Sequence, residues 1–167
     1  MRFRDIVSEA DRLFPNAFSE DEKMGFANDV GALINRKYIK KTKVYTAVGG
    51  EEFSLPPGVT SDLVCEVYFD DKKQSGISVA SMLGRSDGHN VKIVYLDVPT
   101  YTADDELPVS SPYHNLFLYY ILAFICLHSG DSDGFNSNMT IYNTNLMEYE
   151  KTFAQCEGKS LNFKNLW

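Results

Sequence analysis

The stretch LFLYYILAFICL, residues 116–127, is the longest apolar run of the chain and decides its fold. As a helix it would be about 18 Å long, shorter than the roughly 30 Å hydrocarbon core of a bilayer. Ser111 can act as its N-cap with Pro112 at the first helical position, and Gly130 can act as its C-cap. The sequence therefore predicts a buried helix over about 112–129 and no membrane span. Because this helix is apolar on nearly every side, other helices, a sheet or a neighbouring subunit must cover it.

A second long helix is predicted over about 132–155, because six apolar side chains recur there at alternating spacings of four and three. These are Phe135, Met139, Tyr142, Leu146, Tyr149 and Phe153. Their seam suits packing antiparallel on the 112–129 helix after a tight turn. The preceding Asp131-Ser132-Asp133-Gly134 resembles a calcium loop, but Thr140 stands where the bidentate glutamate is needed, so we interpret the segment as a helix cap.

Two shorter helices are predicted near the N-terminus. Ile6, Ala10 and Leu13 have helical spacing up to Pro15, which predicts a helix over residues 5–14. The segment Ser19 to Glu22 has the pattern of a capping box and predicts a helix from about 20 to 39. Its apolar stripe comprises Phe26, Val30, Leu33, Ile34 and Tyr38, and its C-terminal lysines are Lys37, Lys40 and Lys41.

Between residues 42 and 99 the hydrophobic period changes to strict alternation, as in Val64 to Phe69 and in Val91 to Leu96. Turn-forming residues at 70–73 and 86–90 predict antiparallel hairpins. The fold class is therefore α+β: a four-helix core, with two N-terminal and two long C-terminal antiparallel helices, and an inserted small antiparallel β-sheet or hairpin region at about 42–99. We expect one domain over residues 1–156 and an extended C-terminal arm over 157–167.

No catalytic, cofactor or metal site is predicted. His89, His114 and His128 have no partner at metal-ligand spacing, and the acidic loop Asp104 to Glu106 lacks convergent ligands elsewhere. The three cysteines Cys65, Cys126 and Cys156 lie far apart, which favours a reducing compartment over a disulfide framework. The net charge of -7 offers no general attraction for phosphates, so DNA wrapping and membrane-surface binding are disfavoured.

The candidate interaction surfaces are the C-terminal arm and one hairpin tip. The last residues include three large apolar side chains, Phe163, Leu166 and Trp167, which a disordered arm would leave exposed to water. We therefore expect the arm to dock on its own chain or on a neighbour, with disorder as the alternative. The tip contributes Asp70, Asp71, Lys72 and Lys73 as further candidates for a subunit or portal interface.

The order of several segments resembles the head-to-tail connector or adaptor proteins of tailed bacteriophages, over about residues 10–155. The segments that carry the resemblance are Phe18 to Glu22, Leu55-Pro56-Pro57-Gly58-Val59 leading into Val64 to Asp71, the Val91 to Tyr95 strand, Glu106-Leu107-Pro108, Pro112 to Leu116, the Tyr119-Tyr120 pair and Tyr142-Asn143.

This resemblance implies a non-enzymatic homo-oligomer in the virion neck, made in the host bacterial cytoplasm. Such proteins form a ring, commonly of twelve copies, between the portal protein and the tail, stopper or nozzle protein, and genomic DNA passes through without sequence-specific binding or a membrane. The alternatives are a small non-catalytic ligand-binding or regulatory domain, or another neck or tail component such as a stopper or tail terminator. A remoter alternative is an enzyme that uses the Asp104 to Glu106 loop.

Overall fold

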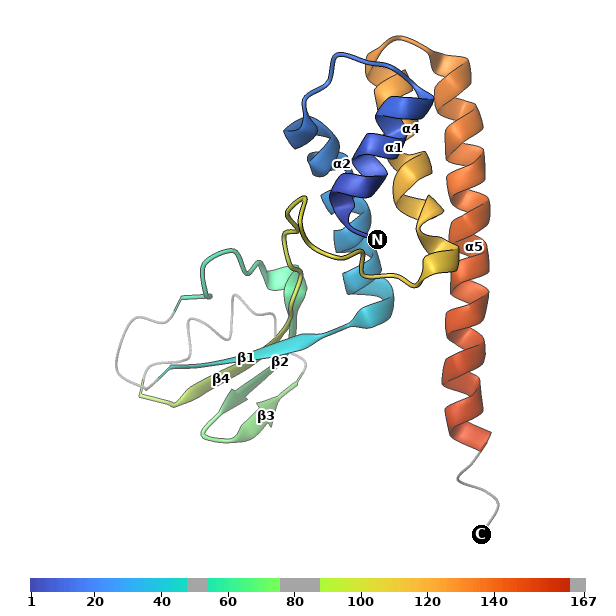
Figure 1. Ribbon diagram of the computed structural model, residues 1–167. Helices are drawn as coiled ribbons and strands as arrows, with labels where there is room; N and C mark the ends of the chain where they lie inside the picture. The colour runs from blue at the N-terminus through green and yellow to red at the C-terminus, as the bar shows by residue number, and fades with distance from the viewer. Residues whose placement is uncertain (48–53, 76–87, 163–167) are drawn as a thin grey trace. The chain divides into compact units, whose positions relative to one another are not determined.

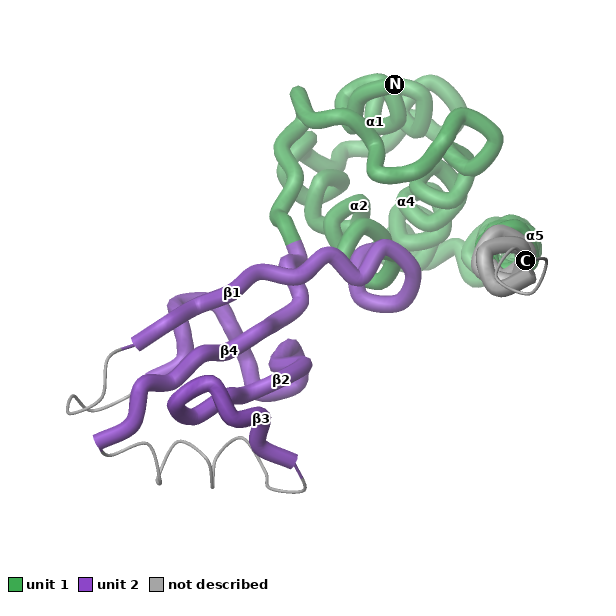
Figure 2. Tube along the Cα trace, turned by 90° about the horizontal axis from the view of Figure 1, so that it is seen from below, with its two compact units in different colours: residues 1–34, 99–167 green, residues 35–98 purple. Residues whose placement is uncertain are grey.

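The computed structural model describes residues 1–47, 54–75 and 88–162, and side chains through residue 153 (Figure 1). Its contacts divide the chain into two compact units, a helical unit of residues 1–34 and 99–167 and a sheet unit of residues 35–98 (Figure 2). In the part of the chain that the structure describes, four α-helices and a small antiparallel sheet confirm the α+β class. The sheet unit contains the strands predicted for the insertion, and it begins at Asn35.

Helix α4 (Asn115–His128) is the centre of the helical unit. It contacts α1 (Phe3–Leu13), α2 (Glu20–Ile34) and α5 (Ser132–Asn162), as Figure 1 shows. Its buried residues are Leu116, Phe117, Leu118, Ile121, Leu122, Ala123, Ile125 and Cys126. The prediction of a buried helix is therefore confirmed, and each large apolar side chain buried here contributes roughly 1.5–3 kcal/mol. Within the described part of the chain, no helix has the length and apolar character to cross a bilayer.

The predicted start of this helix is wrong. Residues Ser111–Tyr113 form a separate 3-10 turn, η3, and α4 begins only at Asn115. Ser110 is the N-cap of this turn and His114 is that of α4, and the turn closes through the Tyr113 amide, which donates to the Ser110 carbonyl at 2.9 Å. The predicted C-terminal end is confirmed: Gly130 has a φ of 80° and its amide donates to the Leu127 carbonyl at 3.1 Å.

Helix α5 packs antiparallel on α4 through the predicted apolar seam. Three ring pairs run in opposite directions along α5 and along η3 with α4: Tyr113–Tyr149 at 5.0 Å, Tyr120–Tyr142 at 5.1 Å and Phe124–Phe135 at 6.1 Å between centroids. The Asp131 carboxylate accepts the Gly134 amide at 2.9 Å, which confirms the helix-cap interpretation. The helix extends to Asn162, so residues 157–162 are helical and not an extended arm.

Helices α1 and α2 cover α4 on its other side. Phe3 is fully buried, stacked on Tyr101 at 4.8 Å and edge-on to Phe117 at 5.3 Å. The capping box at the start of α2 is confirmed, since the Ser19 amide donates to Glu22 Oε2 at 2.8 Å and the Glu22 amide donates to Ser19 Oγ at 3.3 Å.

The buried face of α2 differs in part from the predicted stripe. Val30 and Ile34 are buried as expected, but Leu33 is 38% exposed. The buried face instead includes Lys23, which is 4% exposed and pairs with the Asp11 carboxylate of α1 at 2.6 Å. After Ile34 the chain forms a π-helix, η1 (Asn35–Ile39), so the predicted 20–39 helix changes type in its last turn.

Gly31 of α2 is required by a close approach. A Cβ built at this position would lie 2.8 Å from the Tyr101 ring, which is held by its stack on Phe3 and by hydrogen bonds between its backbone and the Asn28 side chain. Replacing Gly31 with alanine should therefore cost about 1–3 kcal/mol of unfolding free energy, partly offset by about 1 kcal/mol of helix propensity.

Gly25 of the same helix is the matched control, because a Cβ there meets nothing within 4 Å. Gly25→Ala should leave stability unchanged or raise it by up to about 1 kcal/mol. Urea unfolding of both variants measures the difference. Equal effects of the two substitutions would contradict the proposed steric role of Gly31.

The described residues of the sheet unit form four antiparallel strands in the order β1-β4-β2-β3. They are β1 (Thr42–Ala47), β2 (Val64–Phe69), β3 (Lys72–Gln74) and β4 (Val91–Leu96), with a 3-10 turn, η2 (Ser61–Leu63), before β2. Within the described residues, Val67, Val91 and Ile93 form a buried cluster, with four partly buried apolar side chains packed against it. At the base of the insertion the Asp97 amide donates to the Lys41 carbonyl at 2.7 Å, and Lys43 pairs with the Asp97 carboxylate at 2.9 Å.

Candidate functional site

The predicted hairpin tip joins β2 to β3 by a two-residue turn. Phe69 pairs with Lys72, and the intervening Asp70 and Asp71 have φ values of 45° and 64°. Asp70 also anchors the tip to the segment before β4, because its carboxylate accepts the Asn90 amide at 3.0 Å and lies 2.6 Å from His89 Nδ1. The His89 hydrogen bond, followed by that of the Asn90 amide, lowers the pKa of the Asp70 carboxyl.

The four candidate residues of the tip therefore have different roles. Asp70 is bound inside the sheet unit, and Lys73 pairs with Glu66 of β2. Asp71 and Lys72 are exposed at the end of the hairpin. The sequence identified the turn, but it could not show which of its four exposed side chains are bonded inside the sheet unit. The other candidates, Phe163, Leu166 and Trp167, lie outside the described residues.

The two aspartates of the tip provide a matched pair of variants. Asp71→Gly should raise the stability of the sheet unit by roughly 0.5–1 kcal/mol, because glycine adopts positive φ without strain. Asp70→Gly relieves the same kind of strain but removes the bonds to Asn90 and His89, so it should lower stability. Thermal unfolding of both variants tests this, and stabilisation by Asp70→Gly would show that the anchor is unimportant.

The other titratable groups singled out in the sequence have structural partners. Asp104 pairs with Arg4, and the Asp105 carboxylate accepts the Thr102 amide at 2.7 Å, which lowers its pKa. His89 stacks on Phe69 at 5.7 Å. Cys126 is a free thiol whose pKa burial raises. Over residues 1–47, 54–75 and 88–153, no group of three His, Cys, Asp or Glu side chains is arranged to hold a metal ion.

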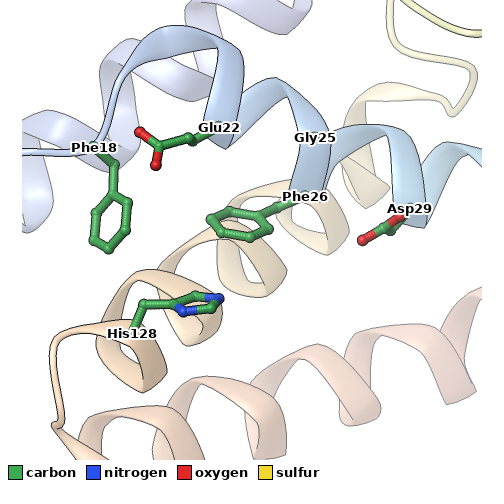
Figure 3. Close-up of a pocket in the computed structure, with 6 residues that line it drawn as sticks. All are labelled: Phe18, Glu22, Gly25, Phe26, Asp29 and His128. Atoms are coloured by element: carbon green, nitrogen blue, oxygen red, sulfur yellow. The ribbon is translucent and has the colours of Figure 1, made fainter.

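The helical unit contains a further site, which we call the aromatic–acidic pocket. It is a hollow of about 380 Å³ between α2 and the end of α4, with Phe18 from the segment before α2 at one side (Figure 3). Its lining residues are Phe18, Glu22, Gly25, Phe26, Asp29 and His128. Four of them come from α2 at spacings of three and four, which puts them on one helix face.

Aromatic rings form the floor of the aromatic–acidic pocket. His128 stacks on Phe26 with centroids 5.7 Å apart and an angle of 15°, and it lies 6.1 Å from Phe18. In Figure 3 these three rings turn toward one shared space. Gly25 leaves this space open, since a Cβ there would meet no atom within 4 Å.

Two carboxylates flank the rings. Glu22 and Asp29 stand on either side of Phe26 along α2, as Figure 3 shows, and both are exposed. The Ser19 amide and hydroxyl bind Glu22 through Oε2 and, together with weaker charge interactions that include His128, lower the pKa of Glu22. Burial raises the pKa of the neighbouring Tyr120, and the negative charge of Asp29 raises it further. The pocket therefore combines π faces with negative charge.

Sequence reasoning missed this site. Phe26 was predicted to lie in an apolar stripe and His128 was considered only as a metal ligand, while Gly25 and Asp29 were not singled out. The signal that could have found it is an acid, a glycine, an aromatic residue and a second acid at positions 22, 25, 26 and 29. In comparisons with known proteins, no family model matches the chain, and no curated protein matches it.

Proposed function

We propose that the chain is a non-enzymatic structural subunit of the neck of a tailed bacteriophage. In this role it is a head-tail adaptor, one copy in a ring that joins the portal protein to the tail, stopper or nozzle protein around the DNA channel. The ring of twelve copies, the virion location and these partners follow from the resemblance of segments such as Phe18 to Glu22 and Pro112 to Leu116.

One structural observation supports this proposal best. The helical unit buries its own core, and the inserted sheet unit has an exposed edge. Strand β1 is an edge strand among the described strands, and Val44 on it is 59% exposed. Edge strands of this kind pair readily with another chain. The hairpin tip, with Asp71 and Lys72, is a second exposed surface on the same unit. Such surfaces suit repeated head-to-tail contacts that close into a ring.

The charge of the chain fits passage of DNA. Sixteen basic and twenty-three acidic side chains give a net charge of -7. A ring whose acidic loops face its channel would repel phosphates and let DNA slide. Filter binding at low salt should therefore detect no tight binding of duplex DNA to the isolated chain.

The experiment that tests the proposal is electron cryomicroscopy of virions made from the genome that encodes the chain, focused on the tail vertex. We expect a ring of this chain between portal and tail. Virions that lack the chain, or that carry it elsewhere in the particle, would overturn the adaptor assignment. A location further down the neck or tail would favour a stopper or tail terminator.

A second function, a small ligand-binding or regulatory domain, is favoured by the aromatic–acidic pocket. Its volume and its mix of apolar and charged groups fit a small cationic ligand. Thermal shift of the purified chain against a panel of small amines and amino acids tests this alternative. A dose-dependent rise in melting temperature, abolished by Gly25→Leu, would support it.

A further inference from the structure

The chemistry of the aromatic–acidic pocket defines the class of group that it can accept. The faces of Phe18 and Phe26 attract a cation through their quadrupoles, and such contacts contribute about 0.5–2 kcal/mol depending on solvent exclusion. Glu22 Oε1 and the Asp29 carboxylate add negative charge at the rim, and among the described residues neither makes an ion pair. An anion would be repelled and a purely apolar group would leave the carboxylates unused. The pocket is therefore built for an ammonium or a guanidinium group.

The chain itself carries such groups in a dense run. The segment Arg36 to Lys43 contains five cationic side chains in eight residues, and we call it the basic segment. All five are exposed. Arg36 pairs with Asp62 at 3.3 Å and Lys43 pairs with Asp97, but within the described residues no ion pair includes Lys40 or Lys41.

The backbone of the basic segment holds these two lysines in a fixed turn. Lys40 has a φ of 49°, a left-handed conformation that ends η1, and its amide donates to the Asn35 carbonyl at 2.8 Å. The next residue, Lys41, accepts the Asp97 amide at its carbonyl. Because the backbone of both residues is already fixed, binding of their ammonium groups by a partner costs little additional backbone entropy.

We infer that the aromatic–acidic pocket of one copy binds the Lys40–Lys41 ammonium groups of the basic segment of a second copy. The charges are complementary: acidic side chains predominate in the helical unit, whereas the basic segment lies in the sheet unit. The two surfaces belong to different units of the chain, because the residues that line the pocket lie in the helical unit and the basic segment lies in the sheet unit. A contact between two different surfaces of identical chains is heterologous, which is the type that closes rings.

This inference deepens the proposed function and rests on it for the idea that copies meet head to tail. Its test is sedimentation velocity of the full-length chain over a range of protein concentrations, at low and high salt. We expect salt-sensitive self-association, which Lys40→Glu with Lys41→Glu weakens by about tenfold or more. Asp29→Lys should weaken it to a similar extent, and Gly25→Leu should weaken it by filling the pocket.

Two further variants make the test specific. Lys151→Glu, at an exposed position of α5, is the control for a change of net charge and should leave association unchanged. A chain that combines Asp29→Lys with Lys40→Glu and Lys41→Glu restores the charge complementarity and should recover association. A non-additive recovery of this kind identifies a direct contact, because independent defects would add.

Several outcomes would overturn the inference. These are a wild-type chain that stays monomeric at all concentrations, association that the Lys40 and Lys41 changes leave intact, or failure of the combined chain to recover. Binding of fluorescent duplex DNA that depends on Lys40 and Lys41, without an effect on association, would assign the basic segment to nucleic acid instead.

The two proposals fail separately. A ring at the tail vertex of virions, together with unchanged association of the variants, would leave the neck function intact and remove the pocket contact. Recovery by the combined chain, together with virions that lack the protein, would establish the contact and remove the neck function.

Discussion

Replacing Phe3 with alanine is expected to lower the unfolding free energy of the helical unit by about 3–5 kcal/mol. Phe3 is completely buried at the first residue of α1, between the Tyr101 ring and the edge of Phe117. Its removal leaves a cavity at the meeting point of α1, α4 and the 99–107 segment. It also loses two aromatic contacts that add to the loss of buried area.

Urea unfolding followed by tyrosine fluorescence and circular dichroism measures this effect. Leu13→Ala is the control on the same helix, because Leu13 is 49% exposed. That change should cost well under 1 kcal/mol. An effect of Phe3→Ala no larger than that of Leu13→Ala would mean that α1 does not depend on its first turn for packing.

Replacing Ile93 with alanine should lower the stability of the sheet unit by about 2–5 kcal/mol. Ile93 is completely buried, and among the described residues it shares a small cluster with the buried Val67 and Val91, so few of these neighbours can rearrange to fill the cavity. Val44→Ala is the control, since Val44 is 59% exposed on the edge strand β1. In so small a unit, this single change removes much of the stability available.

Hydrogen exchange with mass spectrometry separates the two predictions by location. Phe3→Ala should raise exchange in α1, α2 and α4, and Ile93→Ala should raise it in β1, β2 and β4. This follows because each unit is compact by itself and buries its own core. Equal loss of protection throughout the chain in both variants would show that the units unfold as one.

The long helices were predictable because their sequence patterns are dense and their neighbours in space are also neighbours in sequence. The apolar run 116–127 predicts a buried helix, and the apolar seam that ends at Phe153 packs on that helix because the two are adjacent in the sequence. The α2 capping box was also predictable, since both of its partners lie within four residues. The boundary at Ser111 was not predictable, because Pro112 fits the first turn of a 3-10 helix as well as that of an α-helix.

Features that depend on distant partners could not be predicted from local patterns. In the sequence alone, Lys23 cannot be told from a lysine on a solvated face, because its partner Asp11 lies in another helix, α1. Gly25 and Gly31 look equivalent in sequence, but only Gly31 has the Tyr101 ring against it, and only Gly25 opens a pocket. The left-handed Asp70–Asp71 turn was predictable as a turn, while the anchoring role of Asp70 depends on Asn90, across the sheet. The neck function remains a prediction carried by resemblance.

The base of the sheet insertion has a consequence for how such a chain evolves. Thr42 lies opposite Leu96, and the Asp97 amide and carboxylate hold Lys41 and Lys43, so the outgoing and returning segments leave the helical unit as an adjacent pair. The span between them can then lengthen, shorten or be exchanged while the helices keep their packing, since longer loops add only slowly to the closure entropy. Natural selection can therefore change the sheet unit without refolding the helical unit. A shortened chain that joins residues 41 and 97 through a short turn should keep the helical unit intact.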